Sequence, residues 1–387
     1  MTEKPDAMTR AVRAGLETDE VTGAVVPPIY LSATYAFRGY GEKRAYDYSR
    51  SGNPTRDLLG AALAELEGGA GAVVTASGMA AVALCTQILP ARARVVAPHD
   101  CYGGTYRLFD ALNRRGDLEV EFVNFGQDAA LRAALSRPAA LLWVETPSNP
   151  LLRLTDIAAV SMLGKAAGAL VAVDNTFLSP AWQQPLSFGA DLVVHSTTKY
   201  INGHSDVVGG AVIAARAQLH EQLCWWANCL GVTGAAFDSF MTLRGLRTLH
   251  ARLAVHGRNA LELASWLARQ PQVQKVHFPG LPTHPGYDIA LRQQSGFGAI
   301  VTFELAGGIP AVKAFLNGLQ YFSLAESLGG VESLVAHPAS MTHAAMHESA
   351  RRAAGLTDGL LRLSVGIEAL EDLRGDLAAG LARCPAS

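Results

Sequence analysis

The sequence carries no excess of charge of either sign and no long apolar segment. Its 32 lysines and arginines nearly balance 34 acidic residues, for a net charge of −2, which excludes the basic surface typical of nucleic-acid-binding proteins. No run of about 18 apolar residues occurs, so the sequence predicts no transmembrane helix. Met1 to Asp6 precede no apolar segment and do not resemble a signal peptide. We therefore expect neither a nucleic-acid nor a membrane partner.

Cysteine is scarce and scattered. The number and spacing of the cysteines fit neither a disulfide framework nor a zinc site, the five being Cys85, Cys101, Cys224, Cys229 and Cys384. We expect reduced thiols, no metal site and a cytoplasmic location. A G-x-G-x-x-G motif after a strand is also missing from residues 1–80, which disfavours a dinucleotide-binding dehydrogenase.

Apolar residues, by contrast, are plentiful and periodically arranged. They make up 49% of the 387 residues, against 17% charged, enough for two or three domains with a large core. Strands that are apolar throughout and alternate with helices predict an α/β fold, with a mainly parallel sheet covered on both faces. Seven such strands are predicted near 72–74, 94–97, 120–123, 141–144, 170–173, 191–194 and 211–213.

Three regions differ in their sequence pattern. Residues 1–56 are rich in Gly, Pro, Tyr and Arg, and predict an extended arm. The alternating pattern fills 57–256, the predicted large domain. Residues 243–269 predict one long helix that leads into a smaller α+β domain at 257–387.

Two polar residues follow two of these predicted strands. Lys199 comes after the 191–194 run and a cluster of hydroxyl groups, and Asp174 directly follows the 170–173 run. Ligands of parallel sheets bind at the carboxyl ends of the strands. A lysine can bond covalently to an aldehyde cofactor, and an aspartate can keep a pyridine nitrogen protonated. Each residue also has an ordinary alternative, since most lysines are solvated and an aspartate after a strand often caps a turn.

A phosphate site is predicted close by in the sequence. Ser77, Gly78 and Met79 lie where a strand turns into a helix, and a glycine at a helix N-terminus lets backbone N–H groups approach an anion. Ser196 and Thr198 could add hydroxyl donors. Plain helix capping by Ser77 is the alternative.

Three further residues suit a cofactor or a substrate. Tyr102 follows another strand and can stack on an aromatic ring, or it can be a core tyrosine. Arg362 lies in an apolar strand, where a guanidinium is costly unless it meets an anion. That anion could be a substrate carboxylate or the partner of an internal salt bridge. Asn149, between two prolines, could bind a ring hydroxyl or serve a turn.

Together these segments resemble the Cys/Met-metabolism family of pyridoxal-phosphate enzymes. The resemblance runs from about residue 10 to about residue 375. Within the family, 25–29, 99–104 and 225–228 resemble the bacterial enzymes that make cystathionine. The family motifs are Tyr48-Ser49-Arg50, Gly52 to Arg56, Ser77-Gly78-Met79, Asp174-Asn175-Thr176, Ser196 to Asp206 and Glu326 to Ser333.

The resemblance implies a fold-type-I PLP-dependent transferase with pyridoxal 5'-phosphate (PLP) as cofactor. Lys199 would hold the cofactor and move protons, Asp174 would pair with its ring nitrogen, and Tyr102 would stack on its ring. Tyr48 and Arg50 would reach the cofactor site of a neighbouring subunit, in a homotetramer built as a dimer of dimers. The remaining cofactor-binding residues implied are Gly78, Met79, Thr176, Ser196 and Thr198.

The resemblance also implies a set of residues that bind amino-acid substrates. Arg362 and Asn149 would hold the substrate α-carboxylate. Asp47 and Glu326 would hold the amino group of an incoming cysteine, and Arg107 the distal carboxylate of a succinyl group. The full set is Asp47, Arg107, Asn149, Glu326, Ser327 and Arg362.

The implied reaction is γ-replacement on an O-acyl-L-homoserine, with the O-succinyl ester as the favoured substrate. L-Cysteine displaces succinate to give L-cystathionine, in methionine biosynthesis by transsulfuration. Gly104 stands where methionine γ-lyases carry a cysteine, and 324–328 lacks the aromatic residue usual in β-lyases.

Other activities remain open on this sequence. Ser51 stands where synthases acting on succinyl esters can have a second arginine. A cystathionine γ-lyase that catalyses γ-elimination and a synthase that uses O-acetyl esters are therefore alternatives. A non-catalytic relative would not need Lys199, Asp174 and Arg362 intact.

Overall fold

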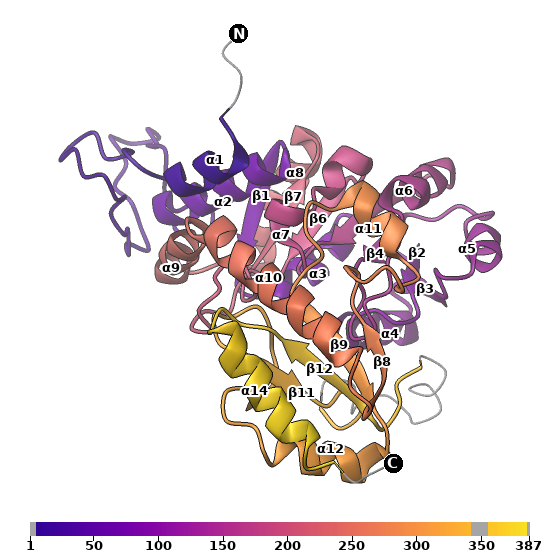
Figure 1. The fold of residues 1–387 in the computed structure, drawn as a ribbon. Coiled ribbons are helices and arrows are strands. Elements are labelled where there is room, and N and C mark those ends of the chain that lie inside the picture. Colours follow the sequence, from indigo (N-terminus) through magenta and orange to yellow (C-terminus); the bar gives the residue numbers. More distant parts are fainter. Residues whose placement is uncertain (1–4, 342–354, 385–387) are drawn as a thin grey trace.

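Two sheets of different size organise the chain in the computed structural model, which describes residues 5–341 and 355–384. The larger sheet has seven strands in the order β1-β7-β6-β5-β4-β2-β3 (Figure 1). Strand β7 is antiparallel to both neighbours, and the other neighbouring pairs are parallel. The predicted α/β fold with a mainly parallel seven-stranded sheet is confirmed. The strands are β1 Gly71–Thr75, β2 Ala93–Pro98, β3 Leu118–Val123, β4 Leu141–Glu145, β5 Leu170–Asp174, β6 Leu192–His195 and β7 Gly210–Ala214.

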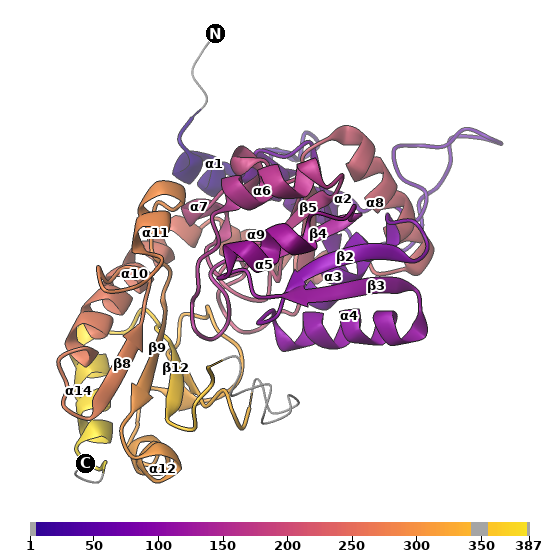
Figure 2. The same ribbon diagram turned by 90° about the vertical axis from the view of Figure 1, so that its right-hand side faces the viewer.

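Helices cover both faces of this sheet (Figure 2). Side chains alternate along each strand, so Trp143 of β4 packs on one face, edge-on to Phe109 of α4, while Leu142 and Val144 pack on the other. The first face is covered by α3 Gly78–Gln87, α4 Gly103–Arg115 and α8 Ala217–Leu230. The second is covered by α2 Pro54–Glu67, α5 Asp128–Ala134 and α6 Ile157–Ala166.

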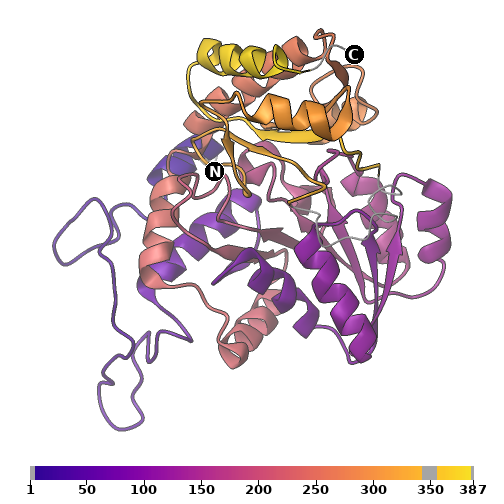
Figure 3. The ribbon, with the colours of Figure 1, turned by 90° about the horizontal axis from the view of Figure 1, so that it is seen from below.

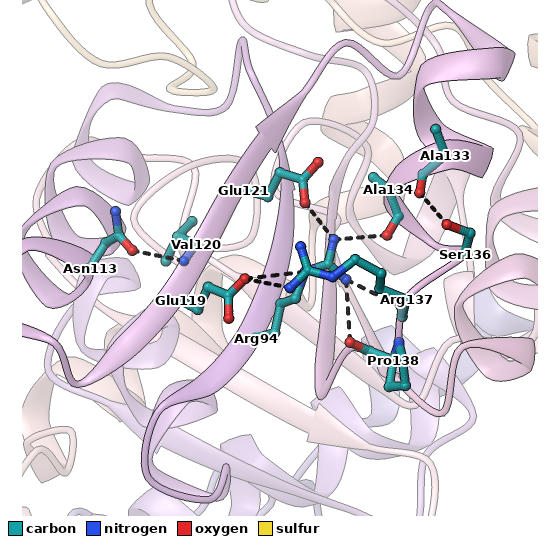
Figure 4. Close-up of polar contacts among 10 residues, drawn as sticks. All are labelled: Arg94, Asn113, Glu119, Val120, Glu121, Ala133, Ala134, Ser136, Arg137 and Pro138. Atoms are coloured by element: carbon teal, nitrogen blue, oxygen red, sulfur yellow. Dashed lines mark hydrogen bonds and ion pairs between the residues drawn. The ribbon is translucent and has the colours of Figure 1, made fainter.

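The β3 edge of the large sheet is charged. The buried Arg94 of β2 binds Glu121 of β3 and the carbonyl oxygen of Ala134, the latter at 2.8 Å (Figure 4). Arg137 reaches Glu119 of the same edge strand at 2.9 Å. Charged side chains along an edge strand disfavour pairing with another chain, so this network protects the sheet and anchors the loop after α5.

The smaller sheet has five strands in the order β10-β11-β12-β9-β8. One of its faces packs against helices through residues such as Phe303 and Leu363. The other face carries Thr302 and Arg362, and the Thr302 hydroxyl donates to the Pro150 carbonyl oxygen at 2.6 Å. That face therefore meets the large sheet. Its elements are β8 Val273–His277, β9 Ile300–Leu305, β10 Ser323–Leu324, β11 Leu334–Ala336 and β12 Leu360–Ser364, with helices α12 Gly308–Leu316 and α14 Leu370–Leu381.

Two helices replace the single one predicted over 243–269. They are α9 Ala236–Leu246 and α10 Leu249–Leu267, so that prediction was wrong. The Gly245 carbonyl oxygen accepts from the Thr248 backbone N–H at 3.1 Å and from the Arg252 guanidinium at 2.8 Å. These contacts tighten and end the helix there.

Helix α10 contacts both parts of the molecule. Near its start, the Arg252 guanidinium donates to the carbonyl oxygens of Tyr200 (2.8 Å) and Ile201 (3.3 Å), which follow Lys199. One turn later, His256 Nδ1 donates to the carbonyl oxygen of Val365, after β12, at 2.6 Å. The predicted domain boundary at residue 256 falls inside this helix, and the division into three regions stays a prediction.

The N-terminal segment leaves the body of the molecule (Figure 3). After α1 Ala7–Arg13 it runs to residue 53 with isolated bridges and no helix or strand longer than a bridge. Large apolar side chains on it are open to solvent, with Val21 92% and Leu31 75% exposed. The remaining short elements are α7 Ser179–Trp182, η1 Pro185–Phe188 and α11 Tyr287–Gln293, and no helix in the described ranges could cross a membrane.

Candidate active site

A cavity of about 500 Å³ opens at the carboxyl ends of the large-sheet strands and faces β12. It gathers residues that are far apart in the sequence. Asp47, Tyr48 and Arg50 are not part of its lining. The predicted site residues that do line it are Gly78, Met79, Tyr102, Arg107, Asn149, Asp174, Thr176, Ser196, Thr198, Lys199, Glu326, Ser327 and Arg362.

Lys199 lies between the two sheets. Its Nζ donates to the hydroxyl oxygen of Ser327 at 2.7 Å. Burial first, and then the positive charge of Arg362, lower the pKa of Lys199 to about 8. About a tenth of the amine is therefore neutral at pH 7, far more than for an ordinary lysine, and only a neutral amine can act as a nucleophile or accept a proton.

Asp174 lies at the carboxyl end of β5, and its carboxylate is fixed by the turn that follows. The backbone N–H of Thr176 donates to Asp174 Oδ1 at 3.0 Å, and the Thr176 hydroxyl accepts from the Ser196 N–H at 2.9 Å. Burial raises the pKa of Asp174. A cation at this carboxylate would favour its ionised form.

The N-terminus of α3 has unpaired backbone amides at the cavity, which can hold an anion. Ser77 caps the helix by accepting from the Ala80 N–H at 3.1 Å, which leaves the first-turn amides of Gly78 and Met79 without helical partners. A Cβ atom at Gly78 would lie 2.8 Å from Ser196 Cβ. Only glycine allows this approach, and the Ser196 and Thr198 side chains line the same cavity.

Arg362 is buried yet keeps an unused N–H group. Its Nη1 donates to Asn149 Oδ1 at 2.9 Å and its Nη2 to the Ser327 carbonyl oxygen at 2.8 Å, while its Nε has no partner among the described residues. Burial lowers its pKa to about 10. Within the described part of the chain its hydrogen bonds go to amide and carbonyl oxygens, which favours a carboxylate ligand over the alternative of an internal salt bridge.

Tyr102 presents its ring to the cavity just before α4. A Cβ atom at Gly104 would lie 2.5 Å from Tyr102 Cε1 and 2.7 Å from Met79 Sδ. The ring thus rests on a residue that has no side chain. Arg107, one turn into α4, and Glu326 are exposed at the same cavity.

Glu145 also lines the cavity, and sequence analysis did not select it. It ends β4 as Asp174 ends β5, and the two are register partners. An acidic residue directly after the apolar 141–144 run was the signal that could have identified it.

Asp47, Tyr48 and Arg50 lie on the projecting segment. Asp47 pairs with Lys43 at 2.9 Å, and Arg50 Nε donates to Asn228 Oδ1 at 3.0 Å. Tyr48 is half exposed. The cavity of the same chain therefore lacks these three side chains, and their predicted roles need a second copy of the chain.

The cavity combines an amine, a buried carboxylate, an anion cradle and a guanidinium. These groups are those that a phosphorylated aldehyde with a pyridine ring requires. The fold and the site together define a PLP-dependent enzyme of fold type I.

Comparisons with known proteins give the family. Residues 8–382 match the family described as Cys/Met metabolism PLP-dependent enzyme. The cystathionine gamma-synthase of Escherichia coli is 58% identical over 373 residues, 96% of this chain and 97% of that protein. The cystathionine beta-lyase of Coxiella burnetii is 47% identical over 375 residues, 96% and 97% of the two chains. The chain belongs to the Cys/Met metabolism family of PLP-dependent enzymes.

Solved structures agree with this family. Cystathionine gamma synthase from Xanthomonas oryzae pv. oryzae, in complex with aminoacrylate and cysteine, matches with a TM-score of 0.97 and 60% identity, covering 98% of this chain and 99% of that chain. The same enzyme in complex with cystathionine matches with a TM-score of 0.97 and 61% identity, with the same coverage.

Proposed function

We propose that the protein is a cystathionine γ-synthase. It joins L-cysteine to the γ-carbon of an O-acyl-L-homoserine: the Cγ–O bond to the acyl group breaks, a Cγ–S bond forms, and the thiol proton is released with the departing carboxylate. The observation that carries this proposal is the identity of 58 to 61% to cystathionine γ-synthases over nearly the whole chain.

The residues of the cavity fit PLP. Lys199 would bond the aldehyde, Asp174 would face the ring nitrogen and Tyr102 the ring. Gly78 allows the first turn of α3 to lie directly against Ser196, so the amides of Gly78 and Met79 would bind the phosphate together with the hydroxyls of Ser196 and Thr198. When bound, PLP supplies the electron-withdrawing ring that makes protons at Cα acidic.

The chain's own groups would then hold the substrate and move the protons. The free Nε–H of Arg362 is available for the α-carboxylate, with Asn149 fixing the guanidinium plane. The neutral amine of Lys199 would accept the Cα proton, and the Ser327 hydroxyl, 2.7 Å from Nζ, would orient it.

Arg107 supports the O-succinyl ester as the substrate. It is an exposed guanidinium that lines the cavity, where it can bind a second carboxylate that acetyl esters lack. Glu326 would hold the amino group of the incoming cysteine, and Asp47 would join it from a neighbouring subunit.

The exposed N-terminal segment supports assembly with further copies of this chain. Apolar side chains such as Val21 and Leu31 are exposed on it, and exposed apolar clusters mark contact surfaces. Docked on a neighbour, the segment would bring Tyr48 and Arg50 to the neighbour's phosphate cradle. Co-expression of Lys199→Ala and Arg50→Ala subunits, each poorly active alone, should restore activity, because mixed pairs contain one site with both residues. No recovery in verified mixed oligomers would contradict shared sites, and sedimentation tests the expected homotetramer.

A product assay tests the activity. The PLP-loaded protein is incubated with O-succinyl-, O-acetyl- or O-phospho-L-homoserine, with and without L-cysteine, and L-cystathionine is measured by mass spectrometry. Cystathionine should form fastest from the succinyl ester. Cystathionine itself is offered in parallel, since Ser51 leaves the γ-lyase as the second candidate. Rapid cleavage without any synthesis would establish the lyase instead.

A further inference from the structure

Glu145 is a buried carboxyl group beside the proposed cofactor site that has no role in the proposed chemistry. It is 7% exposed and ends β4. Strand alternation places it on the same face as Trp143. Its partner in the register of the neighbouring strand is Asp174, so two carboxyl groups lie side by side at the floor of the cavity.

Both oxygens of Glu145 accept hydrogen bonds. The backbone N–H of Tyr102 donates to Oε2 at 2.7 Å, and the indole N–H of Trp143 donates to Oε1 at 3.0 Å. Tyr102 precedes α4 and its own side chain does not cap that helix. Glu145 is therefore the side chain that ties the backbone of Tyr102 to the sheet, while Trp143, fully buried against Phe109, fixes the carboxyl plane.

Two constraints meet at Tyr102. Its backbone is held by Glu145 from the sheet, and its ring lies against the bare backbone of Gly104. A stacking ring must lie within a few tenths of an ångström of its place to be useful in binding. Glu145 can hold the backbone of Tyr102 in place without contacting the cofactor itself.

We propose that Glu145 is a positioning residue that sets the place of the Tyr102 ring over the cofactor by holding the Tyr102 backbone N–H. This inference rests on PLP binding, which belongs to the family, and does not depend on which substrates are joined. It goes beyond the proposed function and can fail independently of it.

The nearby charges determine how the proposal is tested. Burial, and then the charge of Asp174, raise the pKa of Glu145 to about 8. Glu145→Gln keeps the size and shape of this side chain and replaces one acceptor oxygen by an NH₂ donor. Because both oxygens face N–H donors, the amide nitrogen of glutamine must oppose one of them, and one hydrogen bond is lost.

The experiment is a double-mutant cycle on the cofactor-free protein. The dissociation constant of PLP is measured at pH 7 by quenching of tryptophan fluorescence for wild type, E145Q, Y102A and the double variant. We expect E145Q to weaken PLP binding about tenfold. In the Y102A background the same substitution should change the dissociation constant less than about twofold, because the ring that Glu145 positions is gone.

Glu121→Gln provides the matched control, since it makes the same chemical change on edge strand β3 of the same sheet, outside the cavity lining (Figure 4). It should bind PLP as wild type does. A full tenfold loss from E145Q in the Y102A background would overturn the proposal, because it would mean that Glu145 acts through the fold or through Asp174. Unchanged binding in E145Q would overturn it too. If circular dichroism shows that E145Q does not fold, Glu145→Asp, which keeps both acceptors on a shorter arm, enters the same cycle with the same outcomes.

Discussion

The amine of Lys199 lies 2.7 Å from the hydroxyl of Ser327, 128 residues further along the chain. Ser327 holds this position with a φ of 93°, a backbone conformation that favours glycine and is strained for serine. The contact between the amine and the hydroxyl is thus maintained against local backbone strain.

Two substitutions at Ser327 should separate the hydroxyl from the strain. Ser327→Ala and Ser327→Gly both lose the contact with Lys199, and we expect kcat to fall about tenfold in each. Only glycine relieves the backbone, so Ser327→Gly should be more stable than Ser327→Ala by about 1 kcal/mol in urea unfolding. Equal stability of the two variants would show that the strain is absent.

Lys199→Met should abolish turnover and stabilise the cofactor-free protein at neutral pH. The pKa of Lys199 falls from 10.5 to about 8 on folding, so the unfolded chain binds more protons between these values and stability rises with pH across that window. Below pH 8 the wild type bears the full cost of the buried charge. We expect Lys199→Met to melt about 2 °C or more higher than wild type at pH 7, with the difference shrinking towards pH 10.5. Retained replacement activity in this variant would refute the proposed role of Lys199.

Arg362→Lys should weaken substrate binding far more than cofactor binding. Lysine keeps the charge but lacks the planar fork that now reaches Asn149 and the Ser327 carbonyl and leaves Nε free. We expect the KM for the O-acyl-homoserine to rise about 100-fold. The dissociation constant of PLP, measured in the same preparation, serves as the control and should stay within about twofold. A change in PLP binding alone would argue against a carboxylate site.

Gly104→Ala should displace the Tyr102 ring without damaging the fold. The new methyl group would lie 2.5 Å from Tyr102 Cε1, and the half-exposed ring can swing outwards. PLP binding should weaken about tenfold while the melting temperature changes little. Gly375→Ala, on α14 with open space around it, is the matched control and should leave PLP binding intact. An unaffected Gly104→Ala would mean that the ring contributes little.

Arg107→Gln should distinguish between acyl esters. Loss of the guanidinium removes a partner for the distal carboxylate of a succinyl group, so kcat/KM for O-succinyl-L-homoserine should fall about 10- to 100-fold. O-acetyl-L-homoserine, which has no distal carboxylate, is the control substrate and should lose less than about threefold. Equal losses for both esters would remove Arg107 from substrate selection.

The sequence predicts the large sheet well because most of its strands are short, mainly apolar runs separated by helical segments, and it predicts the chemistry at strand ends because ligands bind there. Lys199, Asp174 and Gly78 all follow such runs. The small sheet is less predictable: Leu324 of β10 and Val335 of β11 belong to strands of two and three residues, too short for any periodicity to register.

Residues whose importance arises from tertiary contacts are also hard to predict. Glu145 matters through the Tyr102 N–H, 43 residues earlier in the chain, and no local pattern encodes that pairing. The end of α9 depends on Arg252, whose guanidinium folds back on the Gly245 carbonyl. In both cases a side-chain contact that the local pattern does not encode decides the outcome.

Helix α10 connects the lysine loop of the large sheet to strand β12 of the small sheet. Arg252 fixes it to the residues after Lys199 and His256 fixes it to the end of β12, only four residues along one rigid helix. Lys199, the proposed proton acceptor, and Arg362, the proposed carboxylate-binding residue, are therefore both positioned by contacts to the same helix and not across a hinge between domains. Any swing of the small sheet that preserves these bonds would carry the lysine loop with it. Relative motion of the two sheets would then change how a substrate enters the cavity. The distance between Lys199 and Arg362, which must match the distance between the α-carbon and the carboxylate of the substrate, would stay the same.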